Sequence, residues 1–176
     1  MITGVFETHL KVKDLERSMR FYGETLELEL GEYEEGRRVA FYWVGGDQKH
    51  GMLGVWEERG PIPSQHFAFS VSVEDMLSKA VPYLKERHLQ PKNFLDDGTE
   101  RPMVFGWMPA ISIYFDDPDG HELEFIAMLP GKPRPEAGIV SWEAWQELTV
   151  HDVLTANAPA PHLKSSPSAS SSHGNS

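Results

Sequence analysis

The sequence predicts an α+β fold, in which two βαβββ modules form a curved mixed sheet that encloses a cup and carries the helices outside. Alternation typical of a strand, followed by an apolar stripe typical of a helix, begins near His9 and begins again near His66. Each module would have a small sheet with one apolar face, so we expect neither to be stable alone. The segment 116–125 (DDPDGHELEF) then closes the second module as a hairpin.

The chain divides into three parts. We expect a domain over 1–129, composed of modules 1–60 and 64–129, followed by a linker and short C-terminal helix over 130–157. The remaining segment, 158–176, is rich in Ser, Pro and Ala and has almost no large apolar residue. Burial there cannot offset the entropy lost on ordering, so this tail is expected to be disordered.

The first module begins with a strand and a helix. Residues 2–12 alternate between apolar and polar side chains. Asp14 suits the N-cap of an amphipathic helix whose apolar stripe extends to Leu26. Three strands are then expected over 26–32, 39–44 and 52–56.

The second module repeats this order. Residues 65–71 alternate, and Ser72 suits the N-cap of a second amphipathic helix. Pro82 falls inside that helix and should kink it or break it early. Short strands are then expected over 93–95 and 103–107, before the hairpin.

The hairpin places carboxylates on one face of its second strand. Its turn, 117–120 (DPDG), has Pro to fix φ and Gly to accept a positive φ. Leu123 and Phe125 share the apolar face, so Glu122 and Glu124 point to the opposite face and into the predicted cup. A carboxylate on a rigid strand inside a concavity is a candidate metal ligand or base.

Composition excludes several classes of protein. The chain has no Cys, which rules out a disulfide, a thiolate ligand and a Cys nucleophile. Its formal net charge of -11 argues against nucleic-acid or anionic-membrane partners. There is no apolar run long enough to cross a bilayer and no secretory signal pattern, so we expect a cytoplasmic protein that acts on a small molecule.

Three potential metal ligands fall at matching places in the two modules. His9 lies on the first strand, His66 on the fifth and Glu124 on the last, each on the face opposite the helices. Imidazole and carboxylate suit a divalent ion, and three protein ligands leave positions open for substrate. The alternative for each residue alone is a hydrogen-bonded histidine or a solvated glutamate.

These three residues, the DPDGH turn at 117–121 and the paired modules resemble the vicinal oxygen chelate superfamily over about residues 1–128. That superfamily includes glyoxalase I, extradiol dioxygenases, fosfomycin-resistance thiol transferases and bleomycin-binding proteins. The resemblance implies a divalent metal ion (Zn, Mn, Ni, Co, Mg or Fe) at His9, His66 and Glu124, chelated by vicinal oxygens of a substrate. It also implies a homodimer, often with the cup completed by the partner chain.

Within the superfamily, the ligand count favours the thiol transferases. Glyoxalase I adds a Glu in the strand before the linker, where this chain has Gly54; Glu57 is shifted by an odd number of residues and should face the other way. The segment 112–115 (SIYF) also resembles the thiol transferases. The cation that those enzymes place shortly after the Glu is not found at the matching position, since Lys132 and Arg134 lie in a Pro-rich linker.

Four residues are predicted to line the substrate pocket, and one to act in catalysis. Ser112 and Tyr114 share one strand face, whereas Trp107 and Trp43 would supply aromatic walls, with core packing as their alternative. Glu124 is the predicted catalytic residue. We favour a metal-dependent lyase, isomerase or thiol transferase acting on a small oxygenated substrate, with a low-molecular-weight thiol as a candidate cosubstrate. The alternatives are a non-catalytic dimer that sequesters a small molecule such as an antibiotic, and an Fe(II) extradiol-type dioxygenase.

Overall fold

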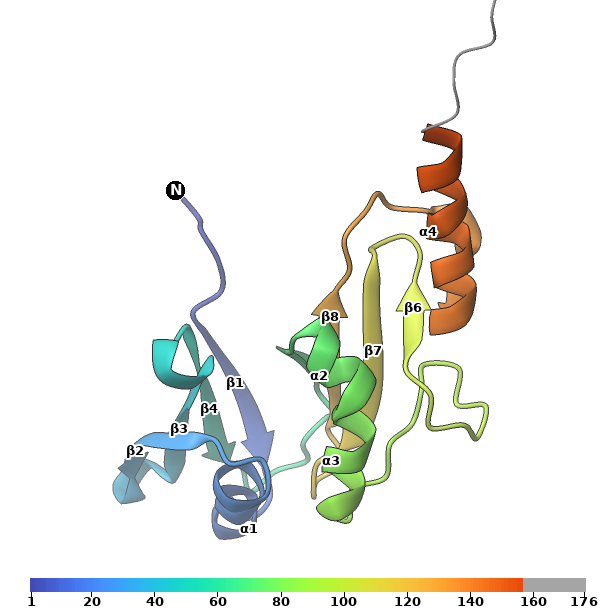
Figure 1. Cartoon of the computed structure of the whole chain (residues 1–176). Coiled ribbons are helices and arrows are strands. Elements are labelled where there is room, and N and C mark those ends of the chain that lie inside the picture. Colours follow the sequence, from blue (N-terminus) through green and yellow to red (C-terminus); the bar gives the residue numbers. More distant parts are fainter. Residues whose placement is uncertain (157–176) are drawn as a thin grey trace, which may run out of the picture.

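The computed structural model describes residues 1–156, and each module forms a sheet of its own (Figure 1). The first sheet has the strand order β1-β4-β3-β2, with β1 and β4 parallel and the other neighbours antiparallel. Its strands are β1 (Glu7–Val12), β2 (Glu29–Glu34), β3 (Val39–Val44) and β4 (Gly51–Glu57).

The second sheet has the order β5-β8-β7-β6-β9, with β5 and β8 parallel. Its strands are β5 (His66–Ser70), β6 (Met103–Phe105), β7 (Ala110–Asp116), β8 (Glu122–Met128) and β9 (Ile139–Ser141). The α+β class and the two βαβββ-like modules are confirmed. The prediction of one curved sheet differs from the structure, because β1 and β5 are edge strands of separate sheets in the described chain.

Two of the helices begin where their N-caps were predicted. The Asp14 side chain accepts a hydrogen bond from the Arg17 N–H, and the Ser72 hydroxyl accepts one from the Asp75 N–H. Pro82 lies in the first turn of a new helix that follows a break at Lys79, as expected for a residue that cannot continue a helix. The α-helices are α1 (Leu15–Met19), α2 (Val73–Ser78), α3 (Ala80–Glu86) and α4 (Trp142–Ala156).

Short helical segments lie between the strands and helices named above. A π-helix continues α1 over Arg20–Thr25, and 3-10 turns occupy Glu35–Arg37, Gly46–Gln48 and Pro135–Ala137. Among the described residues, no helix combines the length and the hydrophobicity that crossing a bilayer requires.

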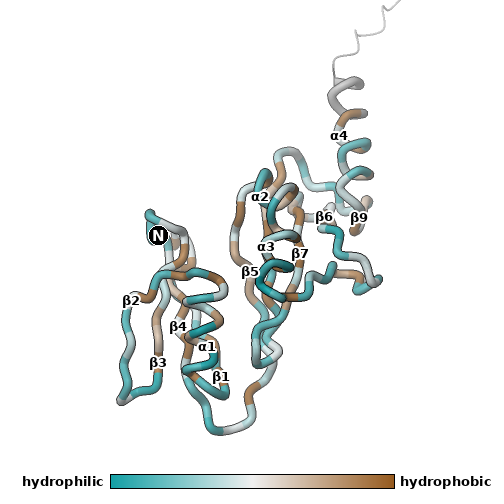
Figure 2. Tube along the Cα trace, turned by 60° about the horizontal axis from the view of Figure 1, so that its bottom comes forward, coloured by the Kyte–Doolittle hydropathy of each residue, from teal (hydrophilic) through white to brown (hydrophobic). Residues whose placement is uncertain are grey.

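The helices cover one face of each sheet and leave the other face open. In the first module α1 packs on β3 and β4; in the second, α2 packs on β7 and β8, and α3 on β7. One hydrophobic cluster collects buried side chains from both modules, among them Leu10, Val55, Met76, Leu84, Ile113 and Leu123. Figure 2 shows this patterning along the chain, with the loop between β2 and β3 hydrophilic and β3 hydrophobic.

Residues 130–156, which we call the C-terminal extension, pack onto the second sheet. The strand β9 pairs antiparallel with β6, and α4 packs beside both (Figure 1). The predicted helix begins after Ser141, whose hydroxyl accepts a hydrogen bond from the Ala144 N–H, and Trp145 is 3% exposed in the core. The sequence did not predict β9. The predicted disordered tail lies outside the described residues.

Candidate metal and substrate site

His66 and Glu124 lie side by side on neighbouring parallel strands. The register pairs Ala68 with Glu124 and His66 with Glu122, which brings the two candidate ligands to the same open face. His66 Nε2 lies 3.2 Å from Glu124 Oε2, and His66 Nδ1 lies 3.1 Å from the Glu122 carbonyl oxygen. The second module therefore brings two of the three predicted ligands together.

The carboxylate of Glu124 is buried and only partly bonded. Its side chain is 6% exposed, and Oε1 makes no hydrogen bond of normal geometry with a described residue, although the Tyr114 phenol lies close enough to interact with the carboxylate. A buried charged oxygen without a partner is unfavourable, and such groups are rare in folded proteins. A divalent cation would satisfy this oxygen, and an imidazole beside a carboxylate is a donor set that such cations accept.

His9 lies on β1 in the other module. Its ring packs 6.0 Å from the Phe41 ring and 5.6 Å from the Trp56 ring, and Nε2 contacts the Glu7 carboxylate. Gly54 is directly opposite in the register, and a Cβ added to Gly54 would lie 2.6 Å from His9 Cδ2. The missing side chain at position 54 thus leaves the space that the imidazole occupies.

The first module has no second carboxylate beside His9 on β4. Glu57 faces the other way, as the odd spacing predicted: its Oε2 accepts hydrogen bonds from the Leu15 N–H at 3.0 Å and from Arg38 Nη2 at 2.6 Å. The Arg38 guanidinium therefore holds the pKa of Glu57 below its usual range. Glu57 secures the start of α1 and is not available as a ligand.

The three predicted ligands do not converge within one chain. In residues 1–156, no group of three or more His, Asp or Glu side chains lies close enough together to hold a metal ion. His66 and Glu124 form one part of the predicted set, and His9 stands apart on the first sheet. The three-ligand centre therefore remains a prediction.

A pocket of about 350 Å³ opens beside Glu124, and two of the predicted pocket residues, Tyr114 and Trp107, line it. Burial raises the pKa of the Tyr114 phenol to about 12, and the neighbouring Glu124 carboxylate contributes to the rise. The phenol therefore stays protonated at neutral pH and can donate a hydrogen bond.

The other two predicted pocket residues lie elsewhere. Ser112 is fully buried, and its hydroxyl has no hydrogen-bond partner among the described residues. Trp43 belongs to the first module, where its ring packs against Phe6 at 6.5 Å and lies 5.2 Å from Lys49 Nζ. Trp43 does not line the Glu124 pocket.

The sequence did not identify six further described residues that line the Glu124 pocket. They are Phe94, Phe105, Met108, Ile126, Gly138 and Ile139. Ile139 belongs to β9, which has only three residues and gives too short an alternation to detect. Phe94 follows an isolated bridge between Lys92 and Tyr114, a long-range pairing that local pattern does not encode.

A larger hollow lies elsewhere in the molecule. It measures about 980 Å³ and is lined in part by the loop after β3 and by the start of α2, including Asp47, Ser72 and Asp75. It shares no lining residue with the pocket beside Glu124. Because the unpartnered carboxylate lies in the smaller pocket, we place the candidate site there.

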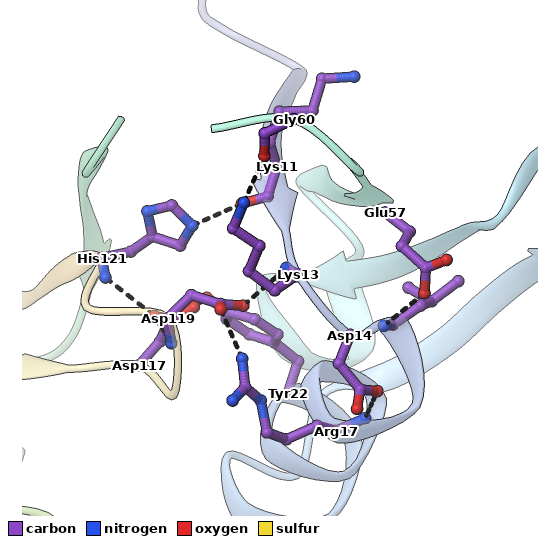
Figure 3. Close-up of polar contacts among 11 residues, drawn as sticks. Lys11, Lys13, Asp14, Arg17, Tyr22, Glu57, Gly60, Asp117, Asp119 and His121 are labelled. Atoms are coloured by element: carbon purple, nitrogen blue, oxygen red, sulfur yellow. Dashed lines mark hydrogen bonds and ion pairs between the residues drawn. The ribbon is translucent and has the colours of Figure 1, made fainter. Parts of the chain in front are cut away.

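The DPDGH turn joins the two modules, as Figure 3 shows. Asp117 accepts hydrogen bonds from the Tyr22 hydroxyl at 2.8 Å and from the His121 N–H at 2.9 Å. Asp119 accepts from the Lys13 N–H at 3.1 Å and pairs with Arg17 Nη2 at 2.5 Å. The turn that marks the sequence so clearly thus holds the second module against β1 and α1.

His121 is part of the same junction and is fully buried. Its Nδ1 accepts a hydrogen bond from the Gln65 N–H at 3.0 Å, and its Nε2 lies 2.6 Å from the Lys11 carbonyl oxygen. Nε2 therefore donates and Nδ1 accepts, which is the pattern of one neutral tautomer. Both ring nitrogens are engaged, so His121 is a structural histidine.

Comparison with known proteins gives matches both in sequence and in structure. The sequence model of the Glyoxalase/Bleomycin resistance protein/Dioxygenase superfamily matches residues 4–125. The chain is 30% identical over 135 residues to the metallothiol transferase FosB of Staphylococcus epidermidis, with 70% of this chain and 80% of FosB covered.

Solved structures with the same fold include two that are at least 25% identical to this chain in sequence. Integron cassette protein HFX_CASS4, from the mobile metagenome of the Halifax Harbour sewage outfall, is 36% identical with a TM-score of 0.61, and the match covers 72% of this chain and 100% of that one. The fosfomycin resistance protein FosX of Listeria monocytogenes is 25% identical with a TM-score of 0.55, and the match covers 73% and 94% of the two chains.

Proposed function

The chain belongs to the glyoxalase/bleomycin resistance protein/dioxygenase superfamily, and on that premise we propose that it is a divalent-metal-dependent enzyme, a thiol transferase or lyase acting on a small oxygenated substrate. One observation carries the proposal. His66 Nε2 lies 3.2 Å from a buried Glu124 carboxylate whose other oxygen has no partner among the described residues. Such a pair is stable when a cation satisfies the free oxygen.

Two observations favour thiol transfer over glyoxalase I chemistry. The position of the additional glyoxalase I carboxylate is Gly54, where any Cβ would collide with the His9 ring. The sequence is also 30% identical to a metallothiol transferase and 25% identical to a fosfomycin resistance protein. The proposed co-substrate is therefore a low-molecular-weight thiol.

The proposal includes a homodimer in which the metal site is shared. His9 of one chain would join His66 and Glu124 of the other, because these side chains lie on the open faces of two separate sheets. His9 and His66 are about half exposed, so both are accessible to a partner chain. Twofold symmetry would produce two equivalent sites.

Each residue has a distinct role in this proposal. A metal ion bound there would supply Lewis-acid polarisation of a substrate oxygen. Glu124 Oε1 is the oxygen available to the ion, so Glu124 acts as a ligand first; its predicted role as proton carrier would compete for the same oxygen. The Tyr114 hydroxyl, protonated at neutral pH, donates a hydrogen bond to a substrate oxygen.

Elemental analysis of protein purified without chelators tests the metal site. We expect about one divalent ion per chain, and its loss in the variants His66→Ala and Glu124→Gln. The exposed loop residue His50 provides a matched control, since His50→Ala should keep the metal. Turnover is then screened with 2-oxoaldehydes and epoxides, each with and without thiols. Metal binding without turnover of any of these compounds would contradict the enzyme and favour the sequestering alternative.

Mixing two inactive variants tests whether the site is shared. His9→Ala and Glu124→Gln each remove one ligand, so neither homodimer has a complete site. In randomly exchanged dimers, half of the molecules are mixed and one of their two sites is intact, so about a quarter of the metal binding should return. A site built within one chain would give no recovery.

A further inference from the structure

We propose that the substrate carries an aromatic or similarly flat apolar ring, and that the C-terminal extension helps to bind this ring beside Glu124. This inference rests on the proposed function, since it assigns the substrate class of the same site. It concerns the pocket of about 350 Å³ described above. The walls of that pocket come from β6, β7, β8 and β9, the loop before β6 and the turn after it.

The lining of the pocket is apolar and contains no cation. Among its described lining residues, Glu124 is the one acidic residue, and none is a Lys or an Arg. The ring-bearing or aliphatic lining residues are Phe94, Phe105, Trp107, Met108, Ile126 and Ile139. Such a pocket favours an apolar group over a phosphonate or other anion.

The pocket is large enough for a ring system. Ligand pockets commonly measure about 300–1,000 Å³, and an engineered apolar cavity of about 150 Å³ accepts benzene. The pocket beside Glu124 therefore has room for one ring or two fused rings. Trp107 is 61% exposed and Phe94 54% exposed at the pocket, so a bound ring would remove aromatic surface from water.

The loop that carries Phe94 is held in place by hydrogen bonds. Asn93 is 3% exposed, and its Nδ2 donates to Asp97 Oδ1 at 2.7 Å and to Thr99 Oγ1 at 2.9 Å. The Phe94 ring packs edge-on against Phe105 with centroids 5.2 Å apart. Phe94 is thus presented to the pocket by a constrained turn.

The wall supplied by the extension depends on Gly106. The Gly106 N–H donates to the Gly138 carbonyl oxygen at 2.8 Å, and the Gly106 carbonyl oxygen accepts from the Arg134 N–H at 2.6 Å. A Cβ at position 106 would collide with the Arg134 carbonyl oxygen and lie 3.0 Å from the Ala137 Cβ. The extension can approach this closely only because residue 106 has no side chain.

This wall is not part of the region that the superfamily model matches. The match ends at residue 125, whereas Gly138 and Ile139 lie beyond it. Membership of the superfamily therefore does not supply this side of the pocket. The extension is the feature of this chain that adds one further apolar side, through Ile139, to the pocket beside Glu124.

Two diols that present the same pair of oxygens test the proposal. Catechol and 2,3-dihydroxynaphthalene differ by one fused ring, and each is titrated calorimetrically into the full chain with and without bound Zn²⁺. We expect the naphthalene diol to bind at least about tenfold more tightly than catechol. Phe94→Ala and Trp107→Ala should remove most of this difference. The control Leu95→Ala, an exposed residue of the same loop that does not line the pocket, should retain it.

Gly106→Ala and Ile139→Ala test the contribution of the extension. Both should reduce the preference for the larger ring while leaving metal content unchanged, and Gly36→Ala, where a Cβ meets nothing within 4 Å, is the control. Circular dichroism shows whether Gly106→Ala folds, and Ile139→Ala tests the wall without a backbone change.

The outcomes separate this inference from the proposed function. Equal affinities for the two diols, or a preference unchanged in Phe94→Ala and Trp107→Ala, would overturn the ring pocket whether or not Zn²⁺ strengthens binding. A ring preference that depends on Phe94 and Trp107 supports the pocket. If that preference persists but Zn²⁺ has no effect on either diol, the metal-dependent function fails and the pocket stands.

Discussion

Two regions of the second module use the same residue types in opposite ways. At the junction around the DPDGH turn, His121 is fully buried and both ring nitrogens are bonded, while Asp117 accepts three hydrogen bonds. At the open face, His66 is half exposed and Glu124 is buried with an oxygen that has no partner among the described residues. The two regions are only a few residues apart along β8 and the turn that precedes it.

This difference separates side chains whose polar atoms are all bonded within the fold from side chains that can still bind another group. A buried polar group that is fully bonded contributes to stability, because its loss leaves its partners unsatisfied. A buried carboxylate with an unpartnered oxygen is unfavourable in the metal-free protein, and such a group is a candidate for a functional site. Substitutions at the junction should therefore reduce stability, whereas substitutions at the open face should reduce binding.

The largest expected effect on stability is at Asp117. Asp117→Ala leaves the buried Tyr22 hydroxyl and the N–H groups of Asp119 and His121 without an acceptor, so the free energy of unfolding should fall by about 3–5 kcal/mol. Urea titration measures this fall in the free energy of unfolding. Asp116→Ala is the control, because Asp116 is exposed and pairs only at the surface with Lys92, and it should cost under about 1 kcal/mol. Similar losses in both variants would contradict the structural role of the turn.

The two histidines provide the next contrast. His121→Ala should lower the free energy of unfolding by about 2–4 kcal/mol, because the Lys11 carbonyl and the Gln65 N–H lose their partners and a buried cavity forms. His66→Ala should change stability by about 1 kcal/mol or less and abolish metal binding. Urea titration and elemental analysis of both variants check the pair. Equal losses of stability in the two variants would show that His121 and His66 do not differ in structural role.

Glu124→Gln should change the free energy of unfolding by a smaller amount, and in the direction of greater stability. The neutral amide removes a buried charge that has no counterion on Oε1, so the metal-free variant should be as stable as the parent or more stable by up to about 1 kcal/mol. Its metal content should fall to background. Glu122→Gln, on the same strand but half exposed, is the control for both measurements. A clear loss of stability in metal-free Glu124→Gln would show that the carboxylate has a structural role.

The smallest effect is expected at a surface cluster that is fully partnered. Arg38 Nη1 and Nη2 pair with Glu16 at 2.7 and 2.8 Å, which lowers the pKa of Glu16 to about 2, with the Arg38 hydrogen bonds as the largest cause. Because the folded pKa is depressed, the stability from this pair is present above the unfolded pKa of about 4.5 and is lost as pH falls toward 2.

Arg38→Gln removes this pair together with the pair between Arg38 and Glu57, so it measures the two contributions jointly. The difference in unfolding free energy between the parent and this variant should be small at pH 7, since these ion pairs lie at or near the surface, and should shrink between about pH 4.5 and pH 2, because Arg38 lowers the pKa of both carboxyl groups. Denaturant titrations across this range check it. A difference that does not change with pH would mean that Arg38 acts through packing alone.

Much of the fold could be predicted because local chemistry specifies it. The caps Asp14 and Ser72, the break near Pro82 and the DPDG turn each act within a few residues, and the structure confirms all of them. Strand alternation also placed His66 and Glu124 on one open face. The pairing of β9 with β6 could not be predicted, because its register depends on close approach at Gly106 rather than on a local pattern.

By itself, the sequence determined the two modules, the element that begins at each cap, and which residues face away from the helices, since periodicity and turn chemistry are local properties. Only the tertiary structure decided that the two sheets are separate, so that His9 lies apart from His66 and Glu124. It also decided that His121 is bonded on both nitrogens while Glu124 retains a free oxygen. The physical reason is that strand pairing and the satisfaction of buried polar groups depend on contacts between residues far apart in the chain, which no local pattern records.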